Sequence, residues 1–246
     1  MLTKEYVLKK LEEKKNLDYK FEAFFTQRHQ YKLKSPINLK KLIKLEKKFN
    51  ISLPKEYRDF ILNIGNGGAG TGYGLYSLEG ALLGESDDIY PYKSSKKGKE
   101  ISKNFIRPDM MLDDDNDDEG LLLLSQHGCG NDDFLIVAGD EKGFIWTVIE
   151  GVGLVPLLKN EPPFPKGEFS TIKNKIWKNK LFLATDDEKM RFDDWYKDWL
   201  EEEPYIYKIP LKIRAIYPFI IIFEIILDSL TPLFLCFKSL KKKWKK

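Results

Sequence analysis

LPKEYRDFILNIGNGGAGTGYGLYSLE, residues 53–79, decides the fold, because it joins two backbone patterns through a glycine-rich turn. Apolar side chains recur at helical spacing over residues 57–64, which predicts an amphipathic helix. Pro54 suits the first helical position, where its missing N–H would have no helical partner, and Gly65 suits the C′ position. The alternation over residues 75–79 predicts a strand. The stretch therefore indicates a helix, a turn and a strand in that order.

Three glycines of this turn match a dinucleotide-binding pattern. Gly65, Gly67 and Gly70 satisfy G-x-G-x-x-G. That pattern binds phosphate only where the glycines follow a strand and open a helix, because the helix N-terminus must face the phosphate. Here a helix precedes the glycines, and its C-terminus carries a partial negative charge. We therefore interpret the turn as a structural connection.

Composition limits the class of protein. An apolar fraction of 42% is sufficient for a core, and the 41 basic and 38 acidic residues nearly balance. The acidic residues crowd the middle of the sequence and the lysines its ends, so local charge says more about partners than net charge. Cys129 and Cys236 are far apart, which favours a reducing compartment. The first residues lack the apolar segment of a secretory signal, so we expect a cytoplasmic protein.

The remaining helices and strands follow from periodicity. Helices are predicted over residues 4–15, over residues 39–49 with Asn38 as N-cap, and over residues 187–203. Short apolar runs separated by turns predict an antiparallel meander, with strands at residues 121–124, 134–138 and 144–149. Residues 156–167 read as an extended loop, and residues 172–183 fit a helix or a strand. Within the helix predicted over residues 187–203, four aromatic residues recur at helical spacing, which is more typical of a core than of a ligand site: Phe192, Trp195, Tyr196 and Trp199.

An acidic run, DDDNDDE, spans residues 113–119. Alternating aspartates are typical of calcium loops, but Asp118 occupies the position that requires glycine, and Leu124 the position that requires glutamate. Two other interpretations stay open: a solvated loop, and an electrostatic contact for a basic partner.

His127 and Cys129 are the residues that most resemble a catalytic pair. A cysteine nucleophile needs an imidazole to take its proton and a third group to orient the ring, and the sequence does not indicate that third group. His29 is the only other histidine, so a metal site has little support. The known hydrolase, metalloprotease and P-loop patterns are absent. We therefore predict no catalytic residue, no cofactor and no metal.

Three segments together resemble the SUKH superfamily, which includes a yeast cell-wall assembly regulator and many bacterial immunity proteins. The segments are residues 53–78, 128–146 and 192–202. The residues that we single out within or next to them as structural are Leu53, Pro54, Tyr57, Gly67, Gly68, Gly128, Gly130, Trp146, Trp195 and Trp199. The resemblance divides the chain into an N-terminal helical segment at residues 1–36 that packs on the domain, a SUKH-like domain at residues 37–203, and a tail at residues 204–246.

The resemblance implies a single α+β domain with a mostly antiparallel or mixed sheet flanked by helices, and no enzymatic activity. Bacterial members typically bind a cognate toxin, often a nuclease, and block it; the yeast relative implies a regulatory or scaffolding role instead. The expected partner is a protein, with no direct contact to nucleic acid. For a basic toxin, the expected contact residues are Asp113, Asp114, Asp115, Asp117, Asp118 and Glu119. The oligomeric state stays open.

The hydrophobic C-terminal extension departs from the family pattern. Residues 215–237 contain 17 apolar residues in 23, and six lysines follow them. That length suffices to cross a bilayer, but Glu224, Asp228 and two prolines oppose crossing. Three interpretations remain: an interfacial anchor, a spanning helix and a segment packed on protein. We favour membrane association through residues 215–246, because the lysines suit anionic headgroups.

Overall fold

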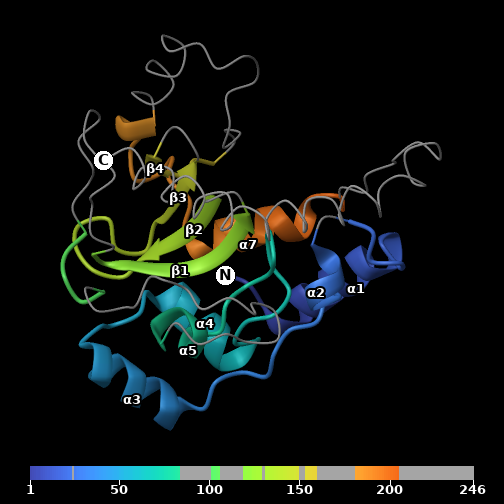
Figure 1. Ribbon diagram of the computed structural model, residues 1–246, viewed down its shortest axis with the longest axis horizontal. Helices are drawn as coiled ribbons and strands as arrows, with labels where there is room; N and C mark the ends of the chain where they lie inside the picture. The colour runs from blue at the N-terminus through green and yellow to red at the C-terminus, as the bar shows by residue number, and fades with distance from the viewer. Residues whose placement is uncertain are drawn as a thin grey trace, which may run out of the picture. The chain divides into compact units, whose positions relative to one another are not determined.

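The computed structural model describes residues 1–23, 25–83, 101–105, 119–128, 131–149, 153–159 and 181–204 (Figure 1). These residues form an α+β fold, which confirms the predicted class. The helices are α1 (Lys4–Leu17), α2 (Thr26–His29), α3 (Leu39–Phe49), α4 (Lys55–Asn63), α5 (Leu78–Leu83) and α7 (Phe192–Glu201). The strands are β1 (Leu121–Gly128), β2 (Asn131–Ile136), β3 (Ile145–Ile149) and β4 (Gly153–Pro156).

The four strands form one antiparallel sheet in sequence order, β1-β2-β3-β4. This arrangement confirms the predicted meander and extends it by β4, which ends at Pro156, where the predicted loop begins. Four residues between Gly153 and Pro156 are too short a run for alternation to stand out. β4 forms because β3 pairs with it, and Thr147 of β3 lies opposite Val155.

α3 and α4 form the helical pair that precedes the glycines. The Asn38 side chain accepts a hydrogen bond from the Lys40 N–H at 2.9 Å, so Asn38 is the N-cap of α3 as predicted. α3 buries Leu42 and Leu45. α4 buries the largest side chains of its apolar stripe, Tyr57, Phe60 and Ile61. Both helices therefore bury the apolar face that their periodicity predicts.

α7 joins the same core through its aromatic residues. The Phe192 ring lies 5.0 Å from the Tyr57 ring and 5.1 Å from the Phe60 ring, centroid to centroid. The helix begins later than predicted, at Phe192. Residues 187 and 188 lie in a turn, and residues 189–191 are extended, because the Met190 N–H donates to the Leu157 carbonyl at 2.8 Å and Lys189 is buried against Glu141.

The glycine-rich turn folds back on itself. Gly68 and Leu75 exchange both backbone hydrogen bonds, at 2.8 and 2.7 Å. The strand predicted over residues 75–79 is wrong, because Leu75 forms only an isolated bridge with Gly68 and α5 begins at Leu78. Two polar side chains explain the helix: the Asn66 carbonyl oxygen accepts from the Leu78 N–H at 3.0 Å, and the Ser77 hydroxyl accepts from the Gly80 N–H at 3.1 Å. Both satisfy first-turn donors that would otherwise be unpaired.

Pro54 and Gly65 bound α4 nearly as expected. Pro54 is the N-cap, one residue ahead of the predicted position, and Gly65 follows the C-cap Ile64. Gly65 does not adopt the left-handed conformation typical of C′ glycines. It is required for space, because a Cβ there would lie 2.9 Å from the Cβ of Leu33.

The N-terminal segment is part of the same core. Val7 and Leu11 of α1 are buried in the cluster that contains α4 and α7. Beyond α1, Asp18 is buried and its carboxylate accepts hydrogen bonds from the Ala23 N–H, the Thr26 hydroxyl and the Tyr31 hydroxyl. This carboxylate therefore organises the turn that leads into α2.

The chain divides into two compact units, Met1–Ile206 and Tyr207–Lys246. The predicted tail at residues 204–246 lies almost wholly outside the described residues, and the acidic run lies outside them except for Glu119. Within the ranges that the structure describes, no helix has the length and apolar character needed to cross a bilayer.

Candidate functional site

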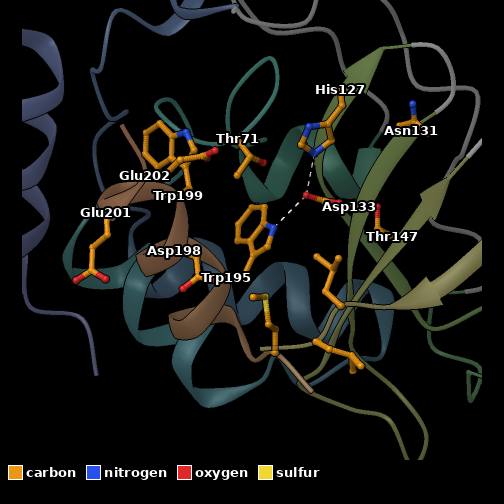
Figure 2. A pocket seen from close by; sticks show the side chains of 13 residues that line it. Thr71, His127, Asn131, Asp133, Thr147, Trp195, Asp198, Trp199, Glu201 and Glu202 are labelled. Carbon is orange, nitrogen blue, oxygen red and sulfur yellow. Dashed lines mark hydrogen bonds and ion pairs between the residues drawn. The ribbon is translucent and has the colours of Figure 1, made fainter. Parts of the chain in front are cut away.

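A groove of about 470 Å³ lies between the sheet and α7 (Figure 2). Strands β1, β2 and β3 supply its polar wall, through His127, Asn131, Asp133 and Thr147. α7 supplies the facing wall. Leu157, Leu158 and Met190 add apolar surface. Such a mostly apolar recess with a few convergent polar groups is the usual form of a binding site.

An irregularity in β1 places His127 beside this groove. Gln126 pairs with Asp132 and Gly128 pairs with Asn131, so His127 is an extra residue with no partner on β2. A bulge of this kind turns a side chain away from the regular alternation of the strand, and bulges are frequent next to functional sites. The bulge therefore lets the His127 side chain contact a neighbour that it would not contact in a regular strand.

A row of polar side chains crosses three strands of the sheet. Asp133 of β2 pairs with Ser125 of β1 and with Thr147 of β3, so the three lie side by side across the sheet. All three are buried. Buried polar groups need partners, and the Ser125 hydroxyl donates to the Thr71 carbonyl at 2.7 Å.

Asp133 is the centre of this row. Its Oδ2 atom lies 2.8 Å from His127 Nε2 and accepts a hydrogen bond from Trp195 Nε1 at 3.0 Å, as the dashed lines of Figure 2 show. The carboxylate side chain is only 6% exposed. A buried carboxylate is costly without donors. The Trp195 contact joins the sheet to α7, and the His127 contact joins β1 to β2.

The charge of His127 depends on Asp133. Burial alone would lower the pKa of His127, but the carboxylates of Asp133 and Asp132 outweigh burial and raise that pKa above its ordinary value. The imidazolium therefore persists to higher pH than in a free histidine. An imidazole paired with a carboxylate can position a ligand or hold a proton.

The facing wall combines aromatic surface with acidic side chains. Trp195 is buried and Trp199 is half-buried, whereas the acidic residues Asp198, Glu201 and Glu202 are exposed. The last turn of α7 holds no basic residue. Partial burial and the carboxylates of Asp194 and Glu201 raise the pKa of Asp198. The groove is therefore negative where the helix dipole already adds negative charge.

The N-terminal segment supports this wall from behind. Lys14 of α1 donates to the Glu202 carbonyl, and its ammonium lies 5.0 Å from the centroid of the Trp199 ring. Burial lowers the pKa of Lys14 to about 8. His29 packs edge-on against Trp199, with ring centroids 6.0 Å apart. Residues far apart in the sequence thus fix one tryptophan of the groove.

Nine of the ten residues predicted as structural are described, and two of them line the groove. Leu53, Tyr57 and Trp146 are buried. Gly67, Gly68 and Gly128 all have positive φ angles. Trp195 and Trp199 line the groove, whereas Gly130 lies outside the described residues.

The predicted contact residues fall largely outside the described part of the chain. Asp113, Asp114, Asp115, Asp117 and Asp118 are not described. Glu119 is described, and it forms an ion pair with Lys103 at 2.8 Å rather than pointing toward the groove.

The structure finds the orienting carboxylate that the sequence did not indicate for His127. Asp133 occupies that position, while Cys129 lies outside the described residues. Asp133 was missed because the sequence pattern placed residues 125–133 in a turn and began the strand at Phe134, whereas Asp133 lies in β2. The available signal in the sequence was an aspartate six residues after a histidine, at a hairpin. The described residues contain no cluster of three or more groups that could hold a metal ion.

These features define an α+β domain with a binding groove built between a meander sheet and a closing aromatic helix. The family model described as the SMI1 / KNR4 family (SUKH-1) matches residues 36–179. The chain belongs to this family, which confirms the resemblance seen in the sequence. Comparisons with curated proteins and with solved structures found no match. The sheet wall of the groove lies within the matched residues, and α7 follows them.

Family membership supports an immunity-like role or a regulatory role of the SMI1/KNR4 type. Members of this family are generally non-catalytic.

Proposed function

We propose that this chain is an immunity protein that binds a cognate bacterial toxin and neutralises it without catalysis. Membership of the SUKH-1 family is the observation that carries the proposal. The groove between the sheet and α7 supports it, because a recess with tryptophan in its wall is typical of the places where protein partners anchor. A nuclease is the toxin class that best fits the acidic character of the chain's middle.

Co-expression with candidate toxins tests this proposal. We expect the chain to restore growth of cells that express its cognate toxin, and a tagged chain to retain that toxin in a pull-down. A matched control is the Tyr57→Asp variant, which places a charge in the core and should lose both effects because it unfolds. Protection without physical association would contradict direct binding.

The acidic run offers a way to test electrostatic steering. Aspartates at residues 113–118 would accelerate encounter with a basic toxin. Replacing Asp113, Asp114, Asp115 and Asp117 by asparagine should slow association at low salt while leaving dissociation nearly unchanged. An unaltered association rate at low salt would remove this role of the run.

A regulatory or scaffolding role is the second candidate. The description of the matched family includes SMI1 and KNR4, and the yeast cell-wall regulator that the sequence resembles belongs to the same superfamily. A toxin gene beside the gene for this chain would favour immunity. Capture of cell-wall synthesis proteins, with no protection against any neighbouring toxin, would favour regulation.

The pairing of His127 with Asp133 gives the catalytic alternative a defined test. An enzyme that used a cysteine nucleophile would lose protection on Cys129→Ala while its fold stayed intact. We expect Cys129→Ala to protect as well as the parent chain.

Membrane association of residues 215–246 is also a proposal. Detergent-free fractionation of the full chain and of a chain that ends at residue 210 would test it. We expect the tail to move the protein into the membrane fraction. Recovery of the full chain entirely in the supernatant would contradict that role.

A further inference from the structure

We propose that the groove between the sheet and α7 binds an arginine side chain of the partner toxin. This inference rests on the proposed function and names the chemistry by which the partner is recognised. An arginine side chain has an apolar stem and a planar cationic head, and the groove offers matching surface to each part.

The apolar surface of the groove suits the stem and the flat face of a guanidinium. Leu157, Leu158 and Met190 form its base, and Trp195 and Trp199 stand along α7. A guanidinium stacks on tryptophan more favourably than on any other aromatic ring. Arginine, tryptophan and tyrosine are also the residues that dominate binding energy at protein interfaces.

The charge of the groove selects a cation. Asp133, Asp198, Glu201 and Glu202 line it, and none of its described lining residues is lysine or arginine. His127 compensates Asp133, and Glu201 accepts a hydrogen bond from the Tyr6 hydroxyl at 2.8 Å. Lys197 lies near Asp198 and Lys14 near Glu202, but neither carboxylate forms an ion pair or a side-chain hydrogen bond within the described residues, so both can face a partner.

The position of these carboxylates is unfavourable for the stability of the free protein. Asp198 and Glu202 lie in the last turn of α7 and just beyond it, where the helix dipole favours cations. A helix end that keeps carboxylates against this rule is typical of a binding site, although Lys14 offsets part of the charge here. A guanidinium placed there would satisfy both the carboxylates and the dipole.

The chain already binds one cation against this wall. The Lys14 ammonium lies over the Trp199 ring and donates to the carbonyl of Glu202. The end of α7 therefore holds a cation through aromatic and oxygen contacts together, which is the combination that we propose for the toxin's arginine.

Binding of a small arginine probe to the full chain tests this inference without any toxin. The probe is N-acetyl-arginine-N-methylamide, and N-acetyl-citrulline-N-methylamide is its uncharged match. The readout is the indole N–H signals of Trp195 and Trp199 in two-dimensional NMR spectra. We expect the arginine probe to shift both signals to saturation below about 50 mM and to bind about fivefold more tightly than the citrulline probe.

Two single-charge variants separate the groove from general acidity. Asp198→Asn should weaken the arginine probe about two- to fivefold, whereas Asp140→Asn, at an exposed turn outside the groove, should leave its affinity unchanged. In each variant without probe, an unchanged signal from the Trp195 indole N–H, which is bonded to Asp133, would show that the variant remains folded.

Three outcomes would overturn the inference: no saturable shift of the indole signals, equal affinity for both probes, or equal affinity in parent and Asp198→Asn. Each outcome is independent of the toxin assays. If the probe binds as expected while no toxin is captured, the groove stands and the immunity proposal fails.

Discussion

At the scale of single residues, Asp133 has the largest consequences. It accepts from an indole of α7 and meets an imidazole of β1, so one carboxylate links three elements. Asp133→Asn should lower the free energy of unfolding by about 1–3 kcal/mol, because both donors lose a charged acceptor inside the protein. Urea unfolding measures this, and Asp140→Asn, at an exposed turn, should change it by less than about 0.5 kcal/mol. Equal effects would contradict the linking role.

The two histidines should respond to pH in opposite directions. The pKa of His127 is raised in the folded chain, so its contribution to stability is full below about pH 6.5 and declines as pH rises through the folded value. Burial lowers the pKa of His29 to about 4, so its contribution is full above about pH 6.5 and is lost as pH falls toward 4.

The size of the His29 effect follows from its shift. A shift from 6.5 to about 4 corresponds to about 3 kcal/mol between the two pH limits. Unfolding experiments on His29→Gln and His127→Gln, from about pH 4 to pH 9, should flatten the acid side and the alkaline side respectively. The same pH profile for both variants would contradict the assignment.

Residue identity singled out three residues of the groove, although it predicted the tryptophans as structural and the histidine as non-catalytic. Trp195 and Trp199 stand out by helical spacing, and His127 stands out by chemistry. The pairing of His127 with Asp133 could not be predicted, because it depends on a bulge that adds one residue to β1. A shift of one residue reverses which face a side chain occupies, and no local pattern records it.

At the scale of elements, the glycine-rich turn is the most constrained part of the chain. Gly68 has φ of +105°, and a Cβ there would collide with the Lys32 carbonyl oxygen. Gly68→Ala should therefore cost more than about 2 kcal/mol of unfolding free energy. Gly128→Ala is the matched control, because it has positive φ but its Cβ would lie 3.3 Å from the nearest atom, the Tyr73 hydroxyl oxygen.

Gly128→Ala should cost only about 1 kcal/mol, the strain of the backbone alone. The difference between the two variants, read from thermal or urea unfolding, isolates the steric part. If Gly68→Ala proved no worse than Gly128→Ala, the close approach of the two backbone segments would be unimportant for stability.

Elements with long periodic patterns were predictable, and those defined by tertiary partners were not. α3 and α4 carry caps and apolar stripes within their own sequence. α5 forms because Asn66, from the preceding turn, caps its first residues, and β4 forms because β3 offers it a partner. Both depend on groups outside the segment, so local alternation misassigned the first and missed the second.

At the scale of the whole molecule, the described core spans α1 to α7 and the family match covers only its middle. Residues of α1 and α7 share one apolar cluster with the matched residues. A chain that ends after Ile206 should therefore unfold cooperatively, with an unfolding free energy within about 1 kcal/mol of the full chain.

Removal of residues 1–17 should act differently, because it strips Val7 and Leu11 from the core and Lys14 from the end of α7. We expect a loss of more than about 3 kcal/mol, measured by urea unfolding. An unchanged unfolding free energy in the chain without α1 would contradict the view that this helix belongs to the domain.

We propose that this chain protects by occupying a toxin and not by transforming it. The most direct test is a titration of cognate toxin activity with purified chain at toxin concentrations well above the dissociation constant. We predict a linear fall in activity that ends at one chain per toxin, reached at once and equally with Cys129→Ala. Progressive inactivation of excess toxin by a small amount of chain would contradict the claim.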